Sequence, residues 1–276
     1  MAKIDRLGWA DGMSFTSYGV RVGVRVNDSA ILAEVISRLP PGSEPASFPV
    51  VDHLYSIVGN TPQRGSKVRR LNLGYWNLLR FARAREFDAV LDAFESHVQL
   101  TVAEFAPRRI FVHAGVVGWK DRAILIPGIS HSGKTTLVDQ LIRAGATYYS
   151  DEYAVLDSRG RVHPYPRALG MRSPDSDKSK KVSAKEIGAT VGSKPLRVGL
   201  VISTSFKDGA RWRPREVTHG KGVLELMSNT VAARSQPERA FTVLPAALKS
   251  ARILKGVRGE AGEIVESILE RASLRL

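Results

Sequence analysis

The stretch AILIPGISHSGKTT, residues 123–136, combines an apolar strand pattern, a loop bounded by two glycines and the start of a helix pattern. Gly128, Gly133, Lys134 and Thr135 stand at the spacing of the Walker A pattern, which binds the phosphates of a nucleotide. The glycines permit a tight turn in which successive backbone N–H groups converge on phosphate oxygens. The sequence therefore predicts a P-loop.

The side chains of this loop have separate expected tasks. Lys134 supplies a positive charge for the terminal phosphates and Thr135 a hydroxyl for Mg²⁺, while the N-terminal end of the helix predicted over residues 134–144 attracts anions. An ordinary glycine turn with a solvated lysine is the alternative, but the flanking strand and helix patterns favour a P-loop. We expect ATP and Mg²⁺ as cofactors, with nucleotide contacts from Gly128, Ile129, Ser130, His131, Ser132, Gly133, Lys134, Thr135 and Thr136.

Two adjacent acidic residues, Asp151 and Glu152, interrupt a strand pattern over residues 146–156 soon after the loop. If this strand neighbours the P-loop strand, its middle comes near the metal and the terminal phosphate. One carboxylate can then orient Mg²⁺ and another can accept a proton from a hydroxyl. The alternative is an acidic pair at a strand end without such a role. The sequence contains neither the Asn-Lys-x-Asp motif of GTPases nor the Leu-Ser-Gly-Gly-Gln signature of ABC ATPases, which argues against both classes.

Three segments together resemble the catalytic domain of HPr kinase/phosphorylase, which is similar in fold to phosphoenolpyruvate carboxykinase. They are VHAGV at 112–116, the loop at 128–135, and RAGA at 143–146 running on to SDE at 150–152. The likeness is strongest over residues 109–160 and continues weakly to the end of the sequence. It implies an α/β fold, namely a P-loop nucleotide-binding domain of the HPr kinase/phosphoenolpyruvate carboxykinase type. The first half of the sequence does not look like that family's usual N-terminal domain, and its own strand and helix patterns predict a smaller α+β N-terminal region.

The resemblance also assigns roles to single residues. Asp151 matches the family's catalytic acid, which serves as base toward the acceptor hydroxyl, and His113 matches a histidine near the terminal phosphate. Glu152 stands where the family has a second aspartate, and Thr135 matches the Mg²⁺-binding hydroxyl. The expected catalytic residues are thus Asp151, His113 and Lys134, and the expected metal ligands are Thr135 and Glu152.

The expected function is a serine kinase similar to HPr kinase, from a divergent branch. It would transfer the γ-phosphoryl group of ATP, with Mg²⁺, to a hydroxyl, with a serine of a protein or peptide as the expected acceptor. One open alternative is a nucleotide-dependent binding module with little transfer activity, which is favoured by Ile129 in place of the acidic residue that the family has there. The other is a small-molecule kinase, which would need a closed pocket in place of a peptide groove.

The rest of the sequence suggests two domains. Residues 20–26 alternate apolar and polar residues as a strand does, and residues 85–105 carry apolar residues at helical spacing until Ala106 and Pro107 end the pattern. We therefore expect an α+β domain over 1–107 and the P-loop domain over 108–276, with strands at 109–117 and 123–126 forming a hairpin into the loop. Residues 173–195, poor in large apolar residues, predict a mobile loop that could act as a lid. Arg167 and Arg172 could reach an anionic ligand, although such arginines are more often surface residues.

The composition indicates which classes of binding partner to expect. The formal net charge of +14 favours anionic partners, such as ATP and an acidic protein or peptide. Nucleic acid is not expected, because no basic run is interleaved with aromatic residues. The sequence has no cysteine, which excludes disulfides, cysteine zinc sites and thiol catalysis but does not indicate a compartment. It shows no apolar signal-peptide core at the start and no apolar run long enough for a membrane span, so we expect a cytoplasmic protein without membrane partners. The oligomeric state stays open, and a homo-oligomer is compatible with the sequence.

Overall fold

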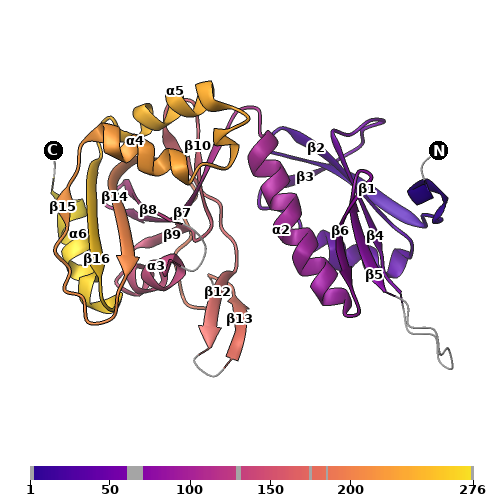
Figure 1. Cartoon of the computed structure of the whole chain (residues 1–276), viewed down its shortest axis with the longest axis horizontal. Helices are drawn as coiled ribbons and strands as arrows, with labels where there is room; N and C mark the ends of the chain where they lie inside the picture. The colour runs from indigo at the N-terminus through magenta and orange to yellow at the C-terminus, as the bar shows by residue number, and fades with distance from the viewer. Residues whose placement is uncertain (1–2, 61–70, 129–131, 174–175, 185, 275–276) are drawn as a thin grey trace. The chain divides into compact units, whose positions relative to one another are not determined.

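The computed structural model of the chain describes residues 3–60, 71–128, 132–173, 176–184 and 186–274 (Figure 1). It is a mixed α/β structure with two large sheets, one in each of two compact units, Met1–Pro107 and Arg108–Leu276.

The second unit is built on an eight-stranded mixed sheet. Its three neighbouring strands β8, β14 and β16 run parallel, whereas β7 is antiparallel to β8. Strand β9 pairs with β7, beside the path of the other seven strands. The order along that path is β11 (Arg161–His163), β10 (Tyr153–Leu156), β7 (Ile110–Trp119), β8 (Arg122–Pro127), β14 (Leu196–Phe206), β16 (Arg252–Arg258) and β15 (Arg215–Glu216), and β9 covers Thr147–Ser150.

Helices cover both faces of this sheet. On one face Leu125 of β8 packs in a cluster with Leu244, and on the other Ile124 packs in a cluster with Leu137. A strand that is covered on both faces needs apolar side chains on both, which explains the continuous run AILI and confirms the predicted strand before the loop. The covering helices are α4 (His219–Ser228) and α5 (Pro237–Leu248) on the first face, and α3 (Lys134–Arg143) and α6 (Val265–Ser273) on the second.

The predicted hairpin into the loop is confirmed as β7 and β8. Its tip residues Lys120 and Asp121 both have positive φ angles, 46° and 60°, as a tight two-residue hairpin turn requires. On β7, Gly115 lies under α3, where an added Cβ atom would be 2.5 Å from Val138 Cγ2. The glycine therefore lets α3 approach β7 closely, and this places the start of α3 near the middle of β7.

The acidic strand pattern forms two strands instead of one, β9 and β10, separated at Asp151 and Glu152. Ser150 Oγ accepts hydrogen bonds from the N–H groups of Glu152 and Tyr153, at 3.1 and 3.0 Å, and this local turn interrupts the ladder. Both strands pair with β7. Strand β7 therefore lies between these two strands and the P-loop strand β8, so the condition that the acidic strand neighbours the P-loop strand is not met.

The loop predicted over residues 173–195 is also corrected. Leu169–Ser173 and Ser176–Val182 form the two-stranded sheet of β12 and β13. Farther along, Ala184 is buried, and the backbone of Tyr148 on β9 exchanges hydrogen bonds of 2.8 Å with Thr190 and Gly192. This segment is held by backbone hydrogen bonds. A low content of large apolar side chains therefore did not predict its structure.

The first unit contains a six-stranded sheet with one long helix against it. The strand order is β3 (Ser43–Ala46), β1 (Asp11–Ser17), β2 (Val20–Val26), β4 (His53–Val58), β5 (Asn72–Trp76) and β6 (Leu79–Ala84). Helix α2 (Phe87–Phe105) packs on it, with the rings of Tyr55 and Phe94 edge to face at 5.2 Å. These elements confirm the strand predicted at 20–26 and the helix predicted at 85–105. Short helical elements complete the fold: η1 (Lys3–Arg6), η2 (Ser29–Ile31), α1 (Leu32–Ile36), η3 (Val231–Ala233) and η4 (Gly262–Ile264).

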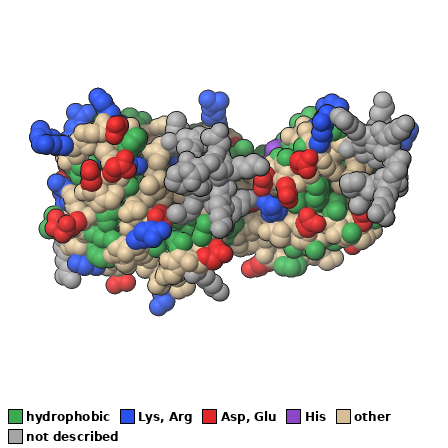
Figure 2. Space-filling view, turned by 90° about the horizontal axis from the view of Figure 1, so that it is seen from below, with side chains coloured by type: hydrophobic (Ala, Val, Ile, Leu, Met, Phe, Trp, Pro, Cys, Tyr) green, Lys and Arg blue, Asp and Glu red, His purple; other side chains and the backbone are tan. Residues whose placement is uncertain are grey.

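The surface carries charges of both signs. On the described part of the face in Figure 2, Lys and Arg side chains are interspersed with Asp and Glu side chains instead of forming one continuous basic band. No helix in the described ranges is long and apolar enough to cross a lipid bilayer.

A buried carboxylate organises the turn between β10 and β11. Asp157 Oδ1 accepts hydrogen bonds from the N–H groups of Arg159 and Arg161, and its Oδ2 accepts from Arg161 Nε and lies 3.0 Å from His163 Nε2. Burial acts to raise the pKa of Asp157, but the hydrogen bonds outweigh it and lower the pKa to about 2.

We expect this carboxylate to make stability depend on pH. Because the folded-state pKa is below the unfolded value, the stabilisation is complete above about pH 5 and is lost as the pH falls toward the folded-state pKa of about 2. Asp157→Asn should therefore destabilise the protein by about 1–3 kcal/mol at pH 7. In urea unfolding followed between pH 7 and pH 2.5, the difference from wild type should shrink as the pH falls. A difference that stays constant over this range would contradict the assignment.

Candidate active site

The glycine-bounded loop begins where β8 ends and closes at the N-terminus of α3. Gly133 is the N-cap residue of α3 and has φ = 82°, in the left-handed region that favours glycine. At Gly128 an added Cβ atom would lie 2.8 Å from Ser132 Oγ, so this end of the loop also has no room for a side chain. Gly133 thus stands where the backbone conformation favours glycine, and Gly128 stands where a side chain would crowd Ser132. Ile129, Ser130 and His131, which are also expected to contact the nucleotide, lie outside the described residues.

Lys134 and Thr135 begin α3 and face the same site. Lys134 Nζ donates a 2.7 Å hydrogen bond to the carbonyl oxygen of Gly128, across the loop. Burial lowers the pKa of Lys134, and the nearby carboxylates of Glu152 and Asp151 act in the opposite direction. Thr135 Oγ1 lies 3.5 Å from Asp151 Oδ2, whereas the side chain of Thr136 is exposed. The structure therefore brings Lys134 and Thr135, but not Thr136, toward the acidic pair.

Asp151 lies in the break between β9 and β10 and is only 8% exposed. The hydroxyl of Tyr148 donates a 3.1 Å hydrogen bond to its Oδ1 atom. Burial raises the pKa of Asp151, although the positive charge of Arg167 and the Tyr148 hydrogen bond counteract this. A carboxylate with a raised pKa is better matched to proton transfer near neutral pH than a solvated one.

Glu152 points toward a different pair of side chains. Its Oε1 lies 3.5 Å from His113 Nδ1, and its Oε2 lies 3.7 Å from an Arg167 guanidinium nitrogen. Burial and the charge of Lys134 lower the pKa of His113, so its ring is neutral at pH 7. Within the described ranges, the structure thus links Thr135 to Asp151 and links Glu152 to His113 and Arg167. No three His, Cys, Asp or Glu side chains of the described residues are arranged as a metal site of their own.

Three further residues belong to this site. The single hydroxyl hydrogen of Tyr148 is shared between Asp151 Oδ1, at 3.1 Å, and the carbonyl oxygen of Arg167, at 3.0 Å. Arg258 of β16 donates to the carbonyl of Gly133 at 3.0 Å. Arg167 follows a segment of the sequence that contains two prolines. The sequence indicated only that Arg167, like Arg172, could reach an anionic ligand. Nothing in the local sequence marks Tyr148 or Arg258.

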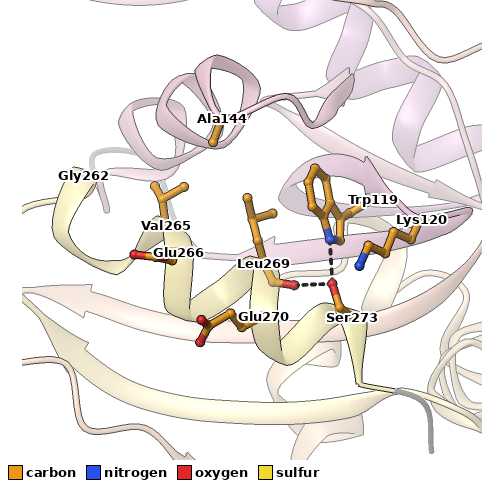
Figure 3. Close-up of a pocket in the computed structure, with 9 residues that line it drawn as sticks. All are labelled: Trp119, Lys120, Ala144, Gly262, Val265, Glu266, Leu269, Glu270 and Ser273. Carbon is orange, nitrogen blue, oxygen red and sulfur yellow. Dashed lines mark hydrogen bonds between the residues drawn. The ribbon is translucent and has the colours of Figure 1, made fainter.

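A surface pocket lies at the opposite end of α3 (Figure 3). The pocket has a volume of about 490 Å³. It is lined by Ala144, which is the C-cap residue of α3, by Trp119 and by residues of α6. Trp119 Nε1 donates a 3.0 Å hydrogen bond to Ser273 Oγ, which in turn donates to the carbonyl of Leu269. Because a helix of this length spans about 15 Å, the pocket is separate from the loop, and none of the expected site residues lines it.

Fold and site together define a mixed α/β protein with a glycine-bounded loop at a helix N-terminus beside a buried carboxylate. No known protein family matches the sequence, and no curated protein matches it. Among solved structures, the chain is similar to the Hpr(Ser) kinase/phosphatase from Coxiella burnetii. That likeness has 15% sequence identity and a TM-score of 0.34 and covers 58% of this chain and 93% of the other. At this TM-score the likeness carries no argument about this chain.

Proposed function

We propose that this protein is a P-loop kinase that transfers the γ-phosphoryl group of ATP, with Mg²⁺, to a hydroxyl group. The proposed acceptor is a serine of a protein or peptide, and an acidic partner would suit the net charge of +14. The observation that carries the proposal is the 3.5 Å approach of Thr135 Oγ1, in the first turn of α3, to the buried carboxylate of Asp151. It brings the predicted metal and phosphate ligands beside a predicted base.

The groups present suit both cofactors. Mg²⁺ prefers hard oxygen ligands and needs only one or two carboxylates besides phosphate oxygens and water, and the predicted ligands Thr135 and Glu152 offer a hydroxyl and a carboxylate. For the phosphates, the site offers the ammonium group of Lys134 and the N-terminal N–H groups of α3. Ser132 Oγ is buried and has no hydrogen-bond partner among the described residues, so it is a further donor for a phosphate oxygen.

Different residues of the site have different proposed roles in phosphoryl transfer. When bound, Mg²⁺ neutralises charge on the phosphate oxygens. Lys134 and the N-terminus of α3 hold the transferred group and stabilise its negative charge. Asp151 accepts the proton of the acceptor hydroxyl, while Tyr148 orients the carboxylate. His113, neutral at pH 7, and Arg167 position Glu152 at the edge of the site.

Lys134→Ala tests the phosphate site. We expect Mg-ATP affinity to fall about 10- to 100-fold, the effect of removing one charged hydrogen bond, because the loop N–H groups remain. The affinity is measured by calorimetry, with Lys249→Ala as the matched control, since it removes the same charge from an exposed lysine at the end of α5. Wild-type affinity in Lys134→Ala would contradict the phosphate site.

The binding module remains the second candidate, because Ile129 occupies the position of the acidic residue found in the family that the sequence resembles. A wild-type protein that binds Mg-ATP but transfers no labelled γ-phosphate to any component of a cell lysate would favour it. Transfer to a metabolite instead of a polypeptide would favour a small-molecule kinase.

A further inference from the structure

Arg258, the last residue of β16, is a buried arginine beneath the loop. It is only 2% exposed. One terminal nitrogen of its guanidinium donates a 3.0 Å hydrogen bond to the carbonyl of Gly133, and the other donates at 2.9 Å to the carbonyl of Gly259. The guanidinium carbon lies 5.7 Å from the centre of the Phe206 ring. The side chain is therefore held in one position against the start of α3.

The charge of this guanidinium is not balanced by an ion pair within the described part of the chain. Its hydrogen bonds go to two backbone carbonyls, and its Nε atom is buried without a hydrogen-bond partner. Burial lowers the pKa of Arg258, but an arginine stays protonated at any pH of interest. The nearby carboxylate of Glu260 counteracts part of the burial effect, but it forms no direct ion pair with the guanidinium among the described residues, and a buried cation without such a pair is costly. The position of Arg258 next to the loop indicates that an anion bound there would offset this cost.

The hydrogen bond to Gly133 also fixes a peptide group that a bound phosphate would use. The carbonyl of Gly133 accepts from Leu137 N at 3.2 Å, as the first hydrogen bond of α3, and from Arg258 at the same time. In a planar trans peptide the next N–H, that of Lys134, points the opposite way, out of the helix N-terminus. A Cβ atom on Gly133 would collide with the guanidinium, so the loop and the arginine are fitted to each other.

We propose that Arg258 is a positioning residue for the phosphates of the bound nucleotide. It holds the Gly133–Lys134 peptide with its N–H group directed at the phosphate site, and it adds a buried positive charge that bound phosphate balances. The proposal rests on the function proposed above. Its ligand class is accordingly the polyphosphate group, independent of the base.

Arg258→Met and Arg258→Lys test this role with two probes, Mg-ATP and Mg-tripolyphosphate, which has no nucleoside. Arg258→Met should weaken the binding of both by about 10-fold or more, since charge and hydrogen bonds are both lost. Arg258→Lys keeps the charge but cannot donate to two carbonyls at once, so it should fall between Met and wild type. The matched control is Arg252→Met, which removes the same charge from the far end of the same strand, about 20 Å away.

Thermal unfolding of the ligand-free variants is measured beside binding. If Arg258 had a purely structural role, both variants would be less stable than wild type, but Arg258→Lys and Arg258→Met would bind the probes with equal affinity. If Arg258→Met does not fold, the comparison of Arg258→Lys with wild type decides. Unchanged affinity in the folded Arg258 variants, with weakened binding in Lys134→Ala, would overturn the role of Arg258 alone. A wild-type protein that binds neither probe would overturn the proposed function and this role together.

Discussion

Replacing Asp151 with asparagine is expected to slow phosphoryl transfer about 100- to 10,000-fold, the usual effect of losing a general base. Asparagine keeps the size of the side chain and can still accept the hydrogen bond from Tyr148, but it cannot take a proton at neutral pH. Binding of Mg-ATP should survive, since Lys134 and the N-terminus of α3 supply most of the phosphate contacts.

The same variant is expected to be more stable than wild type. Because burial raises the folded-state pKa of Asp151 above its unfolded value, the ionised carboxylate destabilises the fold at neutral pH, and this cost is relieved as the pH falls through the folded-state pKa. The neutral amide of the Asp151→Asn variant would carry no such cost at any pH. The variant should thus lose activity and gain unfolding temperature together, a combination that general damage to the structure would not produce.

Single-turnover transfer at saturating Mg-ATP measures the first effect and thermal unfolding the second. Asp139→Asn is the matched control, because Asp139 is also buried but forms a 2.8 Å ion pair with Arg143 on the outside of the site. That variant should keep its transfer rate and lose stability. Equal transfer rates for Asp151→Asn and wild type would show that Asp151 is not the base and would direct attention to Glu152.

Gly160→Ala should have the largest effect on stability. Gly160 has φ = 72°, and an added Cβ atom would lie 2.5 Å from Cα of Ala247 and 2.6 Å from the carbonyl carbon of Ala246, both in the backbone of α5. Backbone atoms of a helix cannot move aside as a side chain can. Backbone strain of about 1–3 kcal/mol adds to a similar cost for the forced contact, so we expect a loss of about 2–6 kcal/mol.

Gly209→Ala separates these two contributions. Gly209 has a similar φ of 66°, but nothing lies within 4 Å of an added Cβ atom there. Urea unfolding should give a small loss for Gly209→Ala, from backbone strain alone, and a much larger one for Gly160→Ala. Equal losses would mean that α5 yields to the added methyl group.

The sequence predicted the features whose signals are local. The run AILI, the glycines at 128 and 133 and the apolar positions of α3 are contiguous, so the strand, loop and helix follow from chain geometry alone. The acidic pair was also visible, and so was the interruption of its strand. The sequence did not predict the order of the strands in the sheet, in which β9 and β10 both pair with β7. Only the three-dimensional structure shows that Asp151 still lies within 3.5 Å of Thr135 Oγ1.

The residues that the sequence missed act over long separations or through the backbone. Arg258 reaches Gly133 from a strand near the other end of the chain, and its own surroundings in the sequence are those of an ordinary strand end. Thr190 and Gly192 pair with Tyr148 through backbone groups, which every residue except proline carries in full, so composition could not predict the contact.

Strand β7 has a consequence for how this protein can diverge. It pairs with β8 along one edge and with β9 and β10 along the other, and its residue His113 lies opposite Tyr153 of β10. Because side chains alternate along a strand, inserting or deleting one residue in β7 would turn every later side chain to the opposite face and shift both edges at once. A change in the length of β7 should therefore not be tolerated. Related chains should vary in length instead at places such as residues 207–214, which lie between β14 and β15 and are largely exposed.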